Sequence, residues 1–180
     1  LPSQSSAPFD VYDEILNTLQ GLLFNSARCL SRLSKRRYAT ITTPQSFALS
    51  GIQTISLGLG VVDYRRKVAR ENVGSELEET LNIAESKGRY IRGELFLNKN
   101  DFPRAKREVI IGLRMLEDGG EGVKRWRGDL EKLKVKIQKR KERSALVDKS
   151  LAKGVARLVN RSMKAGEKGD GVKQMKAMPF

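Results

Sequence analysis

The chain has 180 residues, of which 35 are Lys or Arg and 21 are Asp or Glu, for a formal net charge of +14. It contains no His and one Cys, Cys29, which excludes zinc fingers, His-dependent catalytic triads and an internal disulfide. Hydrophobic residues make up 39% of the chain, enough for a core, while the longest apolar run is far shorter than the roughly 18 residues that span a bilayer. The composition therefore predicts a basic, soluble, helical binding protein without a membrane span or a cofactor, rather than an enzyme.

The positive charge is concentrated at the C-terminal end. Residues 1–122 hold 17 basic and 15 acidic side chains, whereas residues 123–180 hold 18 basic and 6 acidic ones. The last third of the chain must therefore meet an anionic partner or stay solvated.

The N-terminal part predicts one or two amphipathic helices. Residues 1–8 are polar and punctuated by Pro, so we expect a disordered N-terminus. From Asp10 to Leu33 apolar residues recur at helical spacing, which predicts one long helix or two that join near Gly21. Residues 44–74 mix apolar residues with Ser, Thr and Gly, and predict helix only weakly.

Two helices joined by a tight turn are predicted next. Ser75 and Glu78 match a capping box, in which hydroxyl and carboxylate each satisfy a free backbone donor. The helix that they open should run to about Leu97, and Asp101 can cap its successor, which ends at the Gly119-Gly120 pair. A turn this short makes the two helices an antiparallel αα-hairpin.

A long helix is predicted over residues 123–165, followed by a flexible tail over residues 166–180. Its first apolar residues step by four, three and four, and should pack on the preceding hairpin; they are Trp126, Leu130, Leu133 and Ile137. The stripe partly resumes farther on, at Leu151, Val155 and Leu158.

Between these two stripes the predicted helix is charged nearly all round. The segment 131–143 has seven basic and two acidic side chains, and can be a solvated extension or can contact RNA phosphates, an anionic membrane surface or a calmodulin-type partner. Its basic residues are Lys132, Lys134, Lys136, Lys139, Arg140, Lys141 and Arg143.

The hairpin at residues 87–117 resembles a tetratricopeptide repeat. Small residues stand where its two helices would touch, at Gly93 and Ala105, and aromatic residues fill the space between repeats, at Phe96 and Phe102. A weaker copy upstream keeps the same twelve-residue step, from Ala27 to Ala39. The resemblance implies an all-α stack of two or three hairpins over residues 9–122, with residues 44–74 as an insert or a degenerate repeat.

The order of these elements is similar to the tetratricopeptide region of large immunophilins and related co-chaperones. In that family a carboxylate clamp holds the C-terminal Glu-Glu-Val-Asp tail of heat-shock chaperones, and Asn25 and Lys87 match two clamp positions. The clamp arginine would fall on Ile91, with Arg92 directly after it. The resemblance thus implies a non-enzymatic adaptor or co-chaperone that binds an acidic or C-terminal peptide.

Helical spacing adds two residues to the predicted peptide-binding groove that Asn25 and Lys87 would line. Asn25, Arg28 and Arg32 fall at i, i+3 and i+7 and so share one helix face, and arginine forks suit carboxylates. The predicted peptide-binding residues are Asn25, Arg28, Arg32, Lys87 and Arg92.

A second hypothesis makes the chain a helical component of a nucleic-acid-containing assembly, such as a ribosome or its assembly machinery, anchored by residues 124–161. We expect a cytoplasmic protein, with the nucleus and the mitochondrion as open alternatives. The segment from Ser26 to Thr43 is rich in Arg and Ser and free of acid, as mitochondrial presequences are.

Overall fold

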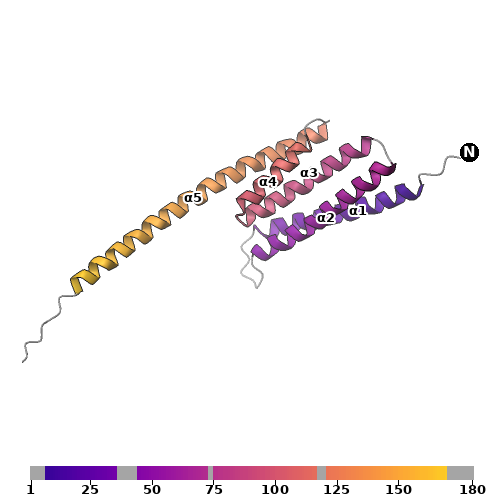
Figure 1. Ribbon diagram of the computed structural model, residues 1–180. Helices are drawn as coiled ribbons and strands as arrows, with labels where there is room; N and C mark the ends of the chain where they lie inside the picture. Colours follow the sequence, from indigo (N-terminus) through magenta and orange to yellow (C-terminus); the bar gives the residue numbers. More distant parts are fainter. Residues whose placement is uncertain (1–6, 36–43, 73–74, 117–120, 170–180) are drawn as a thin grey trace, which may run out of the picture. The chain divides into compact units, whose positions relative to one another are not determined.

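The computed structural model is all-α and describes residues 7–35, 44–72, 75–116 and 121–169 (Figure 1). Its five helices are α1 (Ala7–Leu33), α2 (Pro44–Asn72), α3 (Ser75–Asn98), α4 (Phe102–Arg114) and α5 (Glu121–Gly169). The chain divides into two compact units, Leu1–Lys139 and Arg140–Phe180. The first unit holds α1 to α4 with the start of α5, and the second holds the rest of α5.

The first two helices are long and antiparallel. Arg65 of α2 meets Asp13 near the start of α1, while Gly58 lies against the ring of Phe24 farther along it. A β-carbon at Gly58 would stand 2.7 Å from that ring, so glycine lets the two backbones approach. Residues 44–72 thus form one continuous helix paired with α1.

Helix α3 lies beside both of them, parallel to α1 and antiparallel to α2. Along α1, Ser31 donates a hydrogen bond to Glu94 and Ser34 accepts one from Asn98, so both helices advance in the same direction. Gly88 faces Leu59 of α2 and completes a core cluster that also holds Phe24, Ala27, Ile55, Val62, Leu81 and Leu95.

The predicted hairpin of α3 and α4 is confirmed. The Asp101 carboxylate accepts a hydrogen bond from the backbone N–H of Arg104 at 3.2 Å, and Asn100 takes the left-handed conformation with φ 61°. A β-carbon at Gly93 would lie 3.5 Å from the carbonyl oxygen of Ala105, so the two small residues mark the close approach of the helices. Helix α4 ends at Arg114, earlier than predicted, and Gly119-Gly120 lies outside the described residues.

The first part of α5, residues 121–139, packs on this hairpin through the predicted stripe. Val123, Leu130, Leu133 and Ile137 are buried, and Trp126 is half-buried against the same cluster. A β-carbon at Gly112 of α4 would stand 3.0 Å from Leu130, and one at Gly93 of α3 would stand 3.3 Å from Leu133. The stripe therefore fills a surface made from small residues of two other helices.

The structure shifts several predicted boundaries. Helix α1 begins at Ala7, inside the segment predicted to be disordered, and α5 continues to Gly169, four residues past its predicted end. Ala39, the second small position of the upstream copy, lies outside the described residues.

Helix α2 is long and apolar enough to cross a membrane by length and composition, over Pro44–Ala69 with a mean hydropathy of 1.2. A search for uninterrupted apolar runs misses it because Ser, Thr, Gly and Gln are interspersed. One third of this window is buried inside the protein, and core helices of soluble proteins pass the same test. Its Arg65 is buried and binds the side chains of Asp13, Asn17 and Gln20.

Candidate functional site

Three parallel helices of the first unit present side chains next to one another, and we call this surface the α1–α3–α5 face. Helices α3 and α5 run parallel. Tyr90 of α3 meets Trp126 of α5, and farther along both helices Glu94 meets Lys136. The face consists of Asn25, Arg28, Arg32 and Lys35 from α1 and the turn after it, Lys87, Tyr90 and Glu94 from α3, and Trp126, Asp129 and Lys136 from α5.

The predicted cations of α1 lie at the edge of this face. Asn25, Arg28 and Arg32 are exposed, as their spacing predicts. Neither arginine forms an ion pair with another residue in the part of the chain that the structure describes. On α3, the ammonium of Lys87 lies 6.0 Å from the centre of the Phe24 ring, so it lies against α1. Asn25, Arg28 and Arg32 thus lie on α1 and Lys87 on α3, two helices that contact each other.

An aromatic pair lies on the same face. The rings of Tyr90 and Trp126 meet edge to face, with centroids 6.0 Å apart, and both side chains remain partly exposed. Burial raises the pKa of the Tyr90 phenol, the charges of Glu94 and Asp129 raise it further, and the charge of Arg28 opposes them. The pKa of Tyr90 therefore responds to charged groups of α1, α3 and α5.

Glu94 is the acidic centre of the face. Its carboxylate accepts hydrogen bonds from Lys35 at 2.6 Å and from Ser31 at 2.9 Å, and lies 3.9 Å from the ammonium of Lys136. Burial opposes its ionisation, but the hydrogen bond and charge of Lys35, with Ser31 and Lys136, bring its pKa below the ordinary value. One carboxylate therefore ties α3 to α5 and to the turn after α1.

Arg92, also predicted to line the groove, is used inside the bundle. Its guanidinium lies 2.9 Å from the Glu108 carboxylate, which also pairs with Arg89, and donates to the hydroxyl of Ser56. Arg89 and Arg66 share Glu85, whose pKa is held low by their hydrogen bonds despite burial. The charge of Arg92 is therefore already balanced by a carboxylate, unlike the charges of Arg28 and Arg32.

Sequence analysis assigned Trp126 to the stripe that packs on the hairpin, and assigned neither Tyr90 nor Glu94 to the site. A signal was present, because Lys87, Tyr90 and Glu94 repeat on α3 the i, i+3, i+7 spacing of the three polar residues on α1. The pairing of Glu94 with Lys35 has no such signal, since the two residues are 59 positions apart.

The predicted basic residues of α5 fall in both units. In the first unit, Lys132 lies 3.5 Å from Asp129, and Lys134 lies 3.4 Å from Glu131. Lys136 contributes to the Glu94 cluster, and Lys139 is exposed. In the second unit the basic side chains of this run are exposed; they are Arg140, Lys141 and Arg143.

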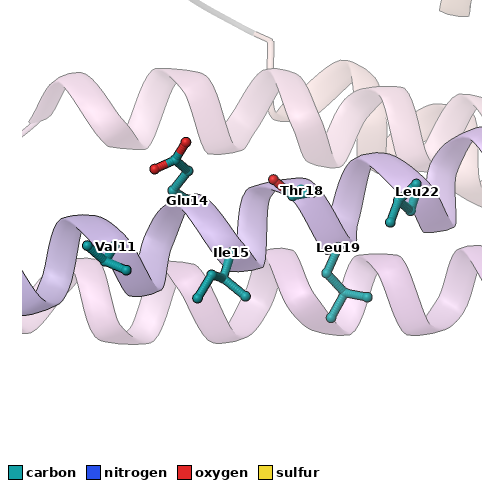
Figure 2. Close-up of a pocket in the computed structure, with 6 residues that line it drawn as sticks. All are labelled: Val11, Glu14, Ile15, Thr18, Leu19 and Leu22. Atoms are coloured by element: carbon teal, nitrogen blue, oxygen red, sulfur yellow. The ribbon is translucent and has the colours of Figure 1, made fainter.

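Helix α1 also carries an apolar surface that faces away from the core (Figure 2). Val11, Ile15, Leu19 and Leu22 are exposed around a shallow hollow of about 440 Å³, which Glu14 and Thr18 also line. The single amphipathic pattern predicted for this helix therefore contains two apolar faces, only one of which packs on α2 and α3.

In the described residues, no three acidic or Cys side chains gather as a metal ion would require. Comparison of the chain with family models, with curated proteins and with solved structures finds no match.

Proposed function

We propose that the protein is an adaptor whose α1–α3–α5 face binds an acidic, extended or C-terminal peptide. The observation that carries this proposal is the pair of exposed arginines, Arg28 and Arg32, beside the partly exposed Tyr90–Trp126 pair. Arginine, tyrosine and tryptophan are the residue types that supply most of the binding energy at protein interfaces.

The helix arrangement supports a solenoid of the tetratricopeptide type. Alternate helices run parallel and line one face, as α1, α3 and α5 do, while α2 and α4 run antiparallel to them. The outer apolar surface of α1 fits the same proposal, because stacked hairpins bury such surfaces against a neighbour. Helices α1 and α2, at 27 and 29 residues, are longer than a repeat of roughly 34 residues can hold, so the likeness is strongest for α3 and α4.

Charge indicates how a peptide would lie. Arg28, Arg32 and Lys87 offer donors to carboxylates, whereas Asp129, one turn from Trp126, would repel them there. We therefore expect the acidic end of the peptide along α1 and an apolar side chain on the aromatic pair. A chaperone tail of the Glu-Glu-Val-Asp type has both features.

Trp126 allows a direct test because it is the only tryptophan of the chain. Titration with a Glu-Glu-Val-Asp peptide should change its fluorescence, and Arg28→Ala/Arg32→Ala should weaken binding by roughly tenfold or more. The matched control is Arg107→Ala/Arg114→Ala, which removes two exposed arginines of α4 and should leave affinity within about twofold. Equal binding by the two double variants would reject the proposed face.

A second candidate is RNA binding through residues 124–161, and the exposed basic residues at 139–143 favour it. Binding would then weaken steeply with salt, because each neutralised phosphate releases a counterion. Measurement of RNA affinity across a salt series, with and without residues 139–180, tests this function. A shallow salt dependence, or unchanged binding after the deletion, would reject it.

A further inference from the structure

The second unit carries aliphatic side chains that nothing in the described chain covers. Val147, Leu151, Val155 and Leu158 are 56% to 66% exposed, although each is large and apolar. Isolated exposed aliphatics are ordinary on protein surfaces, but these four recur at helical spacing on one helix.

These four residues define one side of the helix, which we call the distal stripe. They stand at i, i+4, i+8 and i+11, and at 100° per residue they fall within about 80° of one another. Three basic residues repeat the same step on the opposite side, at Lys149, Lys153 and Arg157. From 144 to 163 the sequence has a single acidic residue, Asp148. From Val147 to Leu158 the helix is therefore apolar on one side and cationic on the other.

This pattern of apolar and basic sides distinguishes between the possible binding partners of the helix. RNA would be bound by phosphate contacts alone and gives no reason for an apolar side. A second copy packed stripe to stripe would leave Lys149, Lys153 and Arg157 in solvent, which gives no reason for the cationic side, and would meet Gly154 beside the stripe. A peptide-binding groove of the calmodulin type takes bulky anchors, and residues 140–163 contain no aromatic residue.

An anionic bilayer surface offers a binding partner to both the apolar and the cationic side of the helix. Aliphatic side chains enter the boundary between headgroups and acyl chains, while lysine and arginine stems reach back to lipid phosphates. Residues 140–163 hold seven basic and two acidic side chains, which adds electrostatic attraction to anionic lipids.

We propose that residues 140–163 form an interfacial helix that binds anionic lipid surfaces, with the distal stripe facing the acyl chains. The proposal concerns the second unit alone and does not depend on peptide binding by the α1–α3–α5 face. It assigns to the protein a second kind of partner, a membrane surface of negative charge.

Co-sedimentation of the full chain with vesicles tests the proposal. The probes are vesicles of phosphatidylcholine alone and vesicles with about one third phosphatidylserine. We expect binding to the anionic vesicles only, reduced by salt, and weakened by more than roughly tenfold in Leu151→Glu/Leu158→Glu. Lys149→Ala/Lys153→Ala/Arg157→Ala should also weaken it, through charge rather than apolar contact.

Leu146 supplies the matched control. It is 67% exposed on the same helix but points away from the distal stripe, so Leu146→Glu should keep binding within about twofold of the parent after allowance for its charge. All substituted side chains are exposed, and circular dichroism verifies that each variant stays helical.

Three results would overturn the proposal. Equal binding to neutral and anionic vesicles would show that lipid charge is not recognised. Equal losses of vesicle affinity in Leu146→Glu and in Leu151→Glu/Leu158→Glu would show that the distal stripe does not face the membrane. Absence of vesicle binding, with self-association that Leu151→Glu/Leu158→Glu abolishes in sedimentation velocity, would assign the stripe to a second copy.

Discussion

Helix α5 contains two apolar stripes, one of which is buried and the other exposed. In residues 121–139 the stripe is buried, with Leu130 at 0% exposure, whereas in residues 140–163 Leu151 is 63% exposed. Both stripes place leucine and β-branched residues at helical spacing, although only the first also holds an aromatic residue, Trp126. The difference comes from what lies opposite the helix.

The first stripe has a complementary surface, made by glycines of α3 and α4. Gly93 and Gly112 leave room for Leu133 and Leu130, and the absence of a β-carbon at each lets α5 approach closely. A periodic apolar stripe thus predicts that a helix needs a partner, and the partner comes from another part of the fold or from outside the chain.

The largest expected effect separates the two stripes by stability. Leu130→Ala should lower the free energy of unfolding by roughly 2–5 kcal/mol, because it leaves a cavity in the core. Leu151→Ala should change it by less than about 0.5 kcal/mol, because its side chain is already in water. Urea denaturation measures both, and equal losses would contradict the division of α5.

Protonation of Glu94 should weaken the packing of the first part of α5 on α3, because Glu94 lies 3.9 Å from Lys136 of α5. The folded-state pKa of Glu94 is lowered, so its contribution to stability is present above the unfolded pKa and is lost as the pH falls through the folded value. Glu94→Gln should lower stability near neutral pH by about 1–3 kcal/mol and flatten its decline in acid. Denaturation at a series of pH values checks this, with Glu131→Gln, an exposed α5 carboxylate, as the control. An unchanged acid dependence in Glu94→Gln would contradict the assigned role.

The smallest effect compares Gly128 and Gly154 of α5, which both have open space beside them. An added β-carbon meets nothing within 4 Å at Gly128 or at Gly154, so alanine at either position should favour the helix by about 0.5–1 kcal/mol. Gly128→Ala should raise the urea midpoint of the first unit. Gly154→Ala should slow amide hydrogen exchange around residue 154 without moving that midpoint. A common rise in the midpoint would mean that both parts of α5 unfold together.

The hairpin of α3 and α4 was the most predictable part of the fold. The side chain of Asp101 and the small residues Gly93 and Ala105 act locally or across one turn, so their spacing is readable in the sequence. Helix α2 was predicted weakly because its Ser, Thr and Gly residues have low intrinsic helix preference, and packing between α1 and α3 outweighs that preference.

The candidate site was predictable in part. Spacing placed Asn25, Arg28 and Arg32 on one exposed face, because helical geometry alone decides which residues share a side. The pairing of Arg92 with Glu108 was not predictable, because it depends on where α4 lies against α3. The same limit applies to Tyr90 and Trp126, which meet only when α5 packs beside α3.

The sequence by itself determined that the chain is helical and which residues share each helix face, because 3.6 residues per turn convert spacing directly into direction. Tertiary structure decided which apolar faces are covered. On α1, Phe24 is buried while Leu22, two residues away, is 61% exposed, and on α5 the two stripes divide in the same way. The physical reason is that burial requires a second surface of matching shape, and such surfaces are assembled from residues far apart in the chain.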